Sequence, residues 1–264
     1  MSELAPTSSA QVPTVPPMSF RRVVGAYLSD AKFESLRLLR TPAFSVPILA
    51  MPILFYGFFG VVLNGRAAAS GFANQLFVGW TVYGVMGPGL FGFGILVAVE
   101  RNMGLLTFKR ALPMPTGSYL ASKLMMAYVF AVVVMAMLVT AGVSFGHVTL
   151  PLLTLIRMAS VMSLGVIPAC AVGLFIGAYA PASSAAAFAN ITYLGMAFLS
   201  GLFFPLSGFV HDIRFIWPTY HLSQLARAAG GMKYEGTSPA HVAVLIATTT
   251  VLVALAARKL ARRG

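Results

Sequence analysis

Long stretches without charge alternate with short basic segments along this chain of 264 residues. A helix needs about 20 apolar residues to cross the hydrocarbon core of a bilayer. Backbone groups inside lipid must bond to one another, so such stretches are expected to be helical. Five charge-free runs are long enough, at 41–65, 67–99, 124–156, 158–211 and 236–257.

The fourth run is too long for a single crossing. Its middle carries Pro181-Ala182-Ser183-Ser184, and Pro with small polar residues is typical of a tight turn between helices. The pattern therefore predicts an all-α integral membrane protein with six transmembrane helices. They are expected near 43–63, 76–98, 125–145, 159–179, 186–206 and 240–257.

Composition agrees with a membrane protein. Apolar residues make up 58% of the chain and charged residues only 9%, whereas soluble domains carry about 25% charged residues. This composition excludes a soluble enzyme and a disordered chain. The single cysteine excludes a disulfide scaffold.

The basic residues predict an orientation. With the N-terminus in the cytoplasm, segments 19–40, 100–123 and 258–264 lie inside and hold 13 of the 18 Lys and Arg residues. This asymmetry fits the positive-inside rule, so both termini are expected on the cytoplasmic side of the cytoplasmic (inner) membrane. The basic excess then serves topology and contact with anionic lipid. Nucleic acid is not an expected partner, because the basic residues do not share one face with interleaved aromatics.

The N-terminal region divides into two parts. Residues 1–18 are rich in Pro, Ser and Thr and are expected to form a disordered tail, leaving one membrane domain over 19–264. Segment 19–40 predicts an amphipathic helix in the inner membrane interface, stopped by Thr41-Pro42. A plain cytoplasmic extension of the first span is the alternative. The apolar stripe of this helix comprises Phe20, Val23, Val24, Tyr27, Leu28 and Ala31.

Segment 100–123 joins the second and third spans on the cytoplasmic side. It predicts a short helix from Leu105 to Leu112, because Pro113 blocks continuation. Such a helix suits docking into a groove on a cytoplasmic partner; a solvated connecting loop fits the segment equally well. The exposed face would offer Leu106, Phe108, Lys109 and Arg110.

Segment 207–239 lies outside in this topology and is too apolar for a solvated loop. It predicts half-helices that dip into the outer leaflet and break at Pro218. Within the fourth span, Gly173 and Gly177 are spaced as G-x-x-x-G. We expect these glycines to serve close packing inside the chain, with a dimer contact as the alternative.

Catalytic chemistry is sparse. No G-x-x-x-x-G-K-[ST] sequence is present, so nucleotide is not bound by that route. His211 and His221 lack further ligands for a metal, and Ser207, His211 and Asp212 alone are little evidence for a triad. No metal or catalytic residue is therefore expected. Asn190 and Tyr193 are expected to bond between helices, with a place on a solute path as the alternative.

Three features together resemble the permease subunits of type-2 ATP-binding-cassette (ABC) exporters. An amphipathic helix leads into six spans. The sequence Leu199-Ser200-Gly201-Leu202-Phe203-Phe204-Pro205 is similar to the end of the family's fifth span, which re-entrant helices follow. A glutamate–glycine–proline segment after the second span is matched by Glu100, Arg101, Gly104, Leu112, Pro113 and Lys123.

This resemblance implies an exporter permease that pairs with a second permease copy and with cytoplasmic ABC ATPases. The ATPase would bind ATP and Mg, and this chain would hold no cofactor. The coupling segment would be formed by Glu100, Arg101, Gly104, Leu106, Phe108, Lys109, Arg110 and Pro113. The solute path would run between the paired permeases, with Gln75, Tyr83, Asn190 and Tyr193 as candidate lining residues.

Two other classes remain as alternatives. A membrane-embedded enzyme acting on lipid or polyprenyl substrates would need paired carboxylates or histidines at one interface. A secondary carrier would keep ionisable residues at membrane depth, and the predicted spans carry only neutral polar groups. Homodimeric and heterodimeric permeases both fit the pattern. Drugs, polysaccharides, lipids and lipo-oligosaccharides all fit an apolar, neutral path.

Overall fold

The computed structural model describes residues 19–63, 72–106, 108 and 117–262, and within them the chain is helical and without strands. The predicted tail 1–18 lies outside these residues. The elements are α1 (Phe20–Leu39), α2 (Pro42–Phe55), the π-helical η1 (Tyr56–Val62), α3 (Phe72–Asn102), α5 (Ser118–Ser144), α6 (Leu152–Leu164), α7 (Val166–Tyr179), α8 (Ala185–Leu199), α9 (Gly208–Ile213), the 3₁₀-helical η3 (Arg214–Ile216), α10 (Pro218–Ala229) and α11 (Ser238–Ala261).

Within the part of the chain that the structure describes, five helical segments are long and apolar enough to cross a membrane: Pro42–Val62, Phe72–Asn102, Ser118–Ser144, Leu152–Tyr179 and Ser238–Ala261. The predicted fifth crossing at 186–206 forms a helix only over Ala185–Leu199, which has 15 residues. It ends early because Gly201 adopts a positive φ of 71°, which turns the backbone out of the helix.

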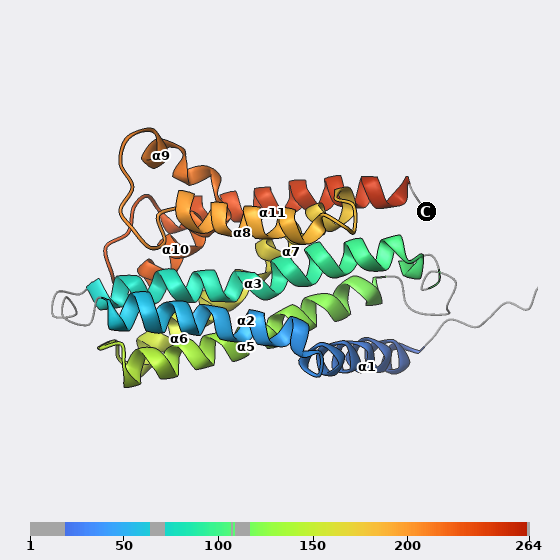
Figure 1. Cartoon of the computed structure of the whole chain (residues 1–264), viewed down its shortest axis with the longest axis horizontal. Helices are drawn as coiled ribbons and strands as arrows, with labels where there is room; N and C mark the ends of the chain where they lie inside the picture. Colours follow the sequence, from blue (N-terminus) through green and yellow to red (C-terminus); the bar gives the residue numbers. More distant parts are fainter. Residues whose placement is uncertain (1–18, 64–71, 107, 109–116, 263–264) are drawn as a thin grey trace, which may run out of the picture.

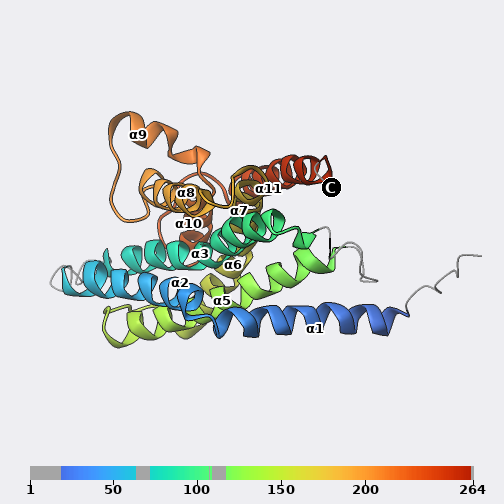
Figure 2. The same cartoon turned by 45° about the vertical axis from the view of Figure 1, so that its right-hand side comes forward.

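The long helices lie side by side along the long axis of the molecule (Figures 1 and 2). Helix α3 occupies the middle and packs against α2, α5, α7 and α8. Helix α1 projects at the end where α11 finishes, whereas α9 and α10 lie at the opposite end (Figure 1). The C-terminal end of α3 therefore lies at one end of the bundle, and α10 lies at the other.

Helices α3 and α7 approach closely because glycine lines their contact. A Cβ atom at Gly173 would lie 2.6 Å from the carbonyl oxygen of Leu90, and one at Gly177 would lie 2.5 Å from that of Phe93. Both distances are too short for a real side chain, so only glycine allows these backbones to meet. The predicted packing role of Gly173 and Gly177 inside the chain is confirmed.

The predicted break at Thr41-Pro42 is confirmed, since α1 ends at Leu39 and α2 begins at Pro42. Pro42 cannot continue the preceding helix but fits the first turn of a new one. Helix α1 then packs along α5 through its buried residues Ala31, Glu34, Ser35 and Leu38. Part of the predicted apolar stripe faces away from this contact and is exposed, namely Phe20, Val24 and Leu28.

The predicted turn before α8 and the predicted break at Pro218 also match the structure. Helix α7 ends at Tyr179 and α8 begins at Ala185, so the segment around Pro181 connects two helices as expected. Segment 207–239 folds into the short helices α9, η3 and α10, and α10 begins at Pro218. The predicted break at Pro218 is confirmed.

Candidate functional site: a buried charge cluster

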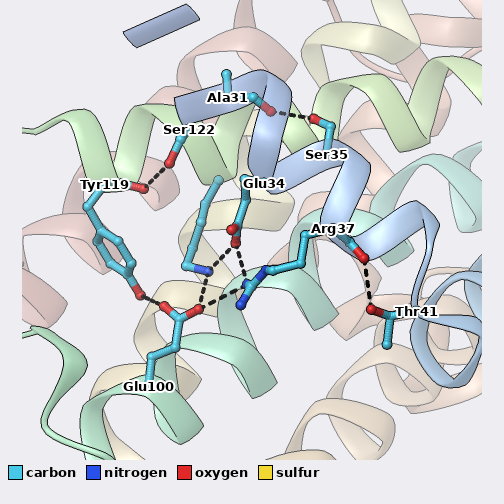
Figure 3. A network of polar contacts seen from close by, with 9 residues as sticks. Ala31, Glu34, Ser35, Arg37, Thr41, Glu100, Tyr119 and Ser122 are labelled. Atoms are coloured by element: carbon cyan, nitrogen blue, oxygen red, sulfur yellow. Dashed lines mark hydrogen bonds and ion pairs between the residues drawn. The ribbon is translucent and has the colours of Figure 1, made fainter. Parts of the chain in front are cut away.

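Four charged side chains and one tyrosine meet where α1, α3 and α5 converge (Figure 3). Lys123 Nζ donates to Glu34 Oε1 at 2.8 Å and to Glu100 Oε1 at 3.0 Å. Arg37 Nη2 donates to the same two oxygens, at 2.9 Å and 3.2 Å. The hydroxyl of Tyr119 donates to Glu100 Oε2 at 2.6 Å. We call these five residues the charge cluster.

Most of this cluster is removed from solvent. Lys123 is 0% exposed, Glu100 is 6% exposed and Glu34 is 8% exposed, whereas the side chain of Arg37 is half exposed. Among the described residues, two carboxylates face two cations, so the formal charges of these four side chains balance. Buried ions are tolerated only when they are paired and hydrogen-bonded, and this cluster meets that requirement with bonds from three different helices.

Helical spacing explains how α1 supplies its part of the cluster. Ala31, Glu34, Ser35 and Leu38 are spaced by three or four residues, so they share one face of the helix and are all buried. Arg37 lies three residues after Glu34, which lets its guanidinium reach the same carboxylate. The two carboxylates raise the pKa of Arg37 above its ordinary value, although partial burial acts in the opposite direction.

The neighbouring Arg101 connects α3 to the end of α7. Its guanidinium donates to the carbonyl oxygens of Ala178 and Ala180, the latter at 2.7 Å. Carbonyls at a helix C-terminus have no partner within the helix and carry partial negative charge. Arg101 therefore satisfies the end of α7 and joins a fourth helix to the same end of the bundle.

The remaining residues of the predicted coupling segment extend from this site. Gly104 is exposed and adopts a positive φ of 73°, a conformation that favours glycine and ends α3. Leu106 is half-buried, and Phe108 is 62% exposed. Lys109, Arg110 and Pro113 lie outside the described residues.

The structure brings together two of the four candidate path residues. The rings of Tyr83 and Tyr193 stack with centroids 4.2 Å apart, and the Tyr193 hydroxyl donates to the carbonyl of Tyr83 at 2.7 Å. Tyr193 thus makes the expected bond between helices, and both rings are buried. Asn190 is exposed and bonds within its own helix, to the carbonyl of Ala186. Gln75 is exposed near the start of α3.

The comparison with known families agrees with this arrangement. The family model described as "ABC-2 type transporter" matches residues 27–234, which include the entire charge cluster. This chain belongs to the ABC-2 type transporter family. The resemblance seen in the sequence is confirmed, and so are the transport permease role and the transmembrane character that it implied.

One curated relative covers almost the whole chain. The protein named "Putative transport permease YvfS" from Bacillus subtilis (strain 168) is 26% identical over 234 residues. The matched region spans 87% of this chain and 94% of that protein. The similarity therefore extends over most of the length of both proteins.

Glu100 and Arg101 were predicted as site residues from the sequence, whereas the roles of Glu34, Arg37 and Tyr119 were not. One signal was present: the chain has only six Asp and Glu residues, and Glu34 lies on the face of α1 that also carries Ala31 and Leu38. A carboxylate on a packed helix face needs a cationic partner. Helical spacing alone could not indicate that this partner would be Lys123, 89 residues later.

A second polar group lies at the other end of this ABC-2 protein, around α10. Glu235 forms an ion pair with Arg214 and accepts a bond from the Tyr220 hydroxyl at 3.1 Å. Nearby, His221 contacts His241 through their Nδ1 atoms, 2.8 Å apart. His221 therefore contacts His241 rather than His211. Within the described ranges, no group of three or more His, Cys, Asp or Glu side chains could hold a metal.

Proposed function

We propose that this chain is the permease subunit of an ATP-driven ABC exporter, coupled to a separate cytoplasmic ATPase that binds ATP and Mg. The observation that carries the proposal is the charge cluster at the base of segment 100–123. Family membership supports transport, and the cluster supplies a physical route from an external motor to the transmembrane helices.

The route follows from where the segment is anchored. It leaves α3 after Asn102 and enters α5 at Ser118, and Glu100 bonds to both Tyr119 and Lys123 on α5. The two ends of the segment are thus bonded to each other. A force applied to the segment moves α3 and α5 together, and α1 follows through Glu34. Packed helices joined in this way shift as units rather than deform continuously.

The exposed part of the segment would form the contact with the ATPase. Phe108 presents an apolar surface beyond the positive φ of Gly104, and the proposal adds Leu106, Lys109 and Arg110 to this contact. Apolar side chains entering a groove, with basic residues at the margin, are a common way for a short helix to dock. Pro113 would end the docked helix.

The membrane arrangement belongs to the same proposal. The charge cluster and both termini face the cytoplasm, as the basic residues predict. Helix α1 lies in the inner interface with Phe20, Val24 and Leu28 toward lipid. Helix α8 completes six crossings, and α9, η3 and α10 sit in the outer leaflet as re-entrant elements. A second permease copy, identical or related, completes the solute path.

The buried positions of Tyr83 and Tyr193 constrain that path. Two stacked rings inside one chain are available to a solute only after α3 and α8 separate. Asn190, exposed on α8, is open to the paired copy without such a change. We therefore assign Asn190 to the path in the resting state and the tyrosine pair to the state driven by ATP.

The decisive experiment compares charge exchanges in the assembled complex. The full chain is purified with the ATPase that co-purifies from native membranes, and ATP hydrolysis by the complex is measured. Glu100→Lys should lower hydrolysis while the complex still assembles, and Glu100→Lys with Lys123→Glu should restore it by re-forming an opposite pair. Lys32→Glu, on the exposed side of α1, is the matched control.

Two outcomes would contradict the proposal. Hydrolysis of ATP by the purified chain alone would remove the need for a partner. Normal hydrolysis in an assembled Glu100→Lys complex would remove the charge cluster from the coupling route.

The orientation is tested separately with Leu106→Cys in a Cys170→Ala background. A membrane-impermeant maleimide should label that cysteine only after the cells are opened.

A further inference from the structure

A cavity of about 350 Å³ lies at the end of the molecule opposite the charge cluster. It is bounded by the start of α3, the chain between α8 and α9, and one face of α10. Figure 1 shows these elements together, far from α1. The cavity is distinct from the stacked pair of Tyr83 and Tyr193, neither of which lines it.

The residues that line this cavity form two chemical groups, which we call its apolar side and its polar side. One side is apolar and includes Leu76, Leu202 and Phe203, all of which are buried. The other group is polar and comes from α10, from η3, from the chain after α10 and from the start of α3. Its residues include Gln75, Arg214, Ser223, Gln224, Arg227 and Glu235. A ligand with an apolar body and a charged head would match both sides.

The polar side carries more positive than negative charge. Arg214 is paired with Glu235, and Glu235 also accepts the hydroxyl of Tyr220. Arg227 is a second cation on the same side, and its Nε is a buried donor without a bond partner among the described residues. Burial is the main reason that the pKa of Arg227 is lowered, yet arginine stays charged at any physiological pH.

Hydrogen bonds hold the polar residues around this cavity in place. Gln224 Oε1 accepts the backbone N–H of Glu235 at 2.9 Å, which fixes the chain that carries this carboxylate. Ser223 donates to the carbonyl of Tyr220. The carboxylate of Glu235 acts on Arg227 as well as on Arg214, so one negative charge faces two cations and the polar side keeps a net positive charge. A buried donor of this kind costs free energy until it meets an acceptor.

We infer that this cavity binds an oxyanion, a carboxylate or a phosphate, carried on an apolar body, with Arg227 as its main cation and Gln75 as a further donor. Arginine is the side chain best suited to such groups, because its planar guanidinium can donate two parallel bonds. The apolar side would hold the body of the ligand. This site does not depend on ATP coupling, so it stands independently of the function proposed above.

The test uses the full chain in nanodiscs made of phosphatidylcholine. Binding of dihexanoyl phosphatidic acid is compared with binding of dihexanoyl phosphatidylcholine, which has the same acyl chains without the surplus negative charge. Inorganic phosphate alone is a third probe. The reporter is tryptophan fluorescence, since Trp80 stacks on Phe203 in the apolar side with ring centroids 4.0 Å apart.

The anionic amphiphile should bind more tightly than its zwitterionic counterpart. Arg227→Gln should weaken that binding by about tenfold or more, since bonds to charged groups contribute about 1.5–3 kcal/mol. Arg227→Lys should restore part of it. Arg258→Gln, an exposed cation in the last turn of α11, should bind as the wild type does.

A second variant keeps the test valid if Arg227→Gln does not fold. Gln75→Ala removes an exposed side chain that lines the cavity and should also weaken binding of the anionic amphiphile. Binding of inorganic phosphate alone would identify a free anion as sufficient, whereas binding of the amphiphile alone would identify a lipid-type headgroup. Equal binding of the two amphiphiles, or unchanged binding by Arg227→Gln, would overturn the inference.

Discussion

Glu100 and Glu235 have similar partners at opposite ends of this ABC-2 family member, but in very different surroundings. Each carboxylate accepts a tyrosine hydroxyl and faces a basic side chain. Glu100 is 6% exposed, and its partner Lys123 is completely buried. The side chain of Glu235 is 56% exposed. The same chemical groups are therefore shielded from water in one place and exposed to it in the other.

Solvent access decides what each set of bonds is worth. An exposed ion pair contributes about 0–1 kcal/mol, because water competes for both partners. A buried pair adds little net stability over apolar residues, yet removal of one partner leaves an uncompensated charge in a medium of low dielectric constant. The charge cluster therefore tolerates little change in its residues. The Glu235 group is more exposed, so water competes for its ion pair.

The largest expected difference concerns Lys123. Lys123→Met should lower the free energy of unfolding by about 3–5 kcal/mol, because it removes the fully buried cation that neutralises Glu34 and Glu100. Chemical unfolding of the full chain in detergent would measure this loss. Lys32→Met, which removes an exposed cation from α1, should change the free energy by less than about 0.5 kcal/mol. Similar losses in the two variants would contradict a special role for burial.

Tyr119 and Tyr220 allow the same comparison with a smaller change to each carboxylate. Tyr119→Phe removes a 2.6 Å bond to the buried Glu100 and should cost about 1.5–3 kcal/mol. Tyr220→Phe removes a 3.1 Å bond to the exposed Glu235 and should cost less than about 1 kcal/mol, since water replaces the hydroxyl. Unfolding in detergent under identical conditions would compare the two. Equal costs would show that solvent access does not separate these carboxylates.

The sequence predicts the surroundings of Glu100 better than those of Glu235. Charge-free runs reveal the long helices because water and lipid impose a simple rule on composition. Glu100 and Arg101 stand out because they begin a charged segment directly after such a run. The early end of α8 was not predictable in this way, since it depends on the local conformation of Gly201. The apolar run continues past that residue without a change in composition.

Partner choice is the other part that sequence could not provide. A helical pattern indicates which residues share a face, but not which helix will lie against that face. The bond between Glu34 and Lys123 joins positions 89 residues apart, and the contact between His221 and His241 joins two separate helices. Such pairs follow from the three-dimensional packing of α1, α5, α10 and α11, which no local spacing encodes.

The smallest expected effect concerns salt, and it separates the two carboxylates without removing either. A double-mutant cycle on Arg214 and Glu235, with each residue replaced by Gln, should give a coupling energy of about 0.2–1 kcal/mol at low ionic strength. About 1 M NaCl should abolish most of it, because the Debye length then shrinks to about 3 Å. The corresponding cycle on Lys123 and Glu100 should keep its coupling energy at the same salt concentration, because Lys123 is 0% exposed and Glu100 only 6% exposed, which keeps ions from solution away from the pair. Both cycles would be measured by chemical unfolding in the same detergent. Salt sensitivity of the cycle on Lys123 and Glu100 would mean that solution ions reach the charge cluster. The charge cluster would then resemble the exposed Glu235 group at the opposite end.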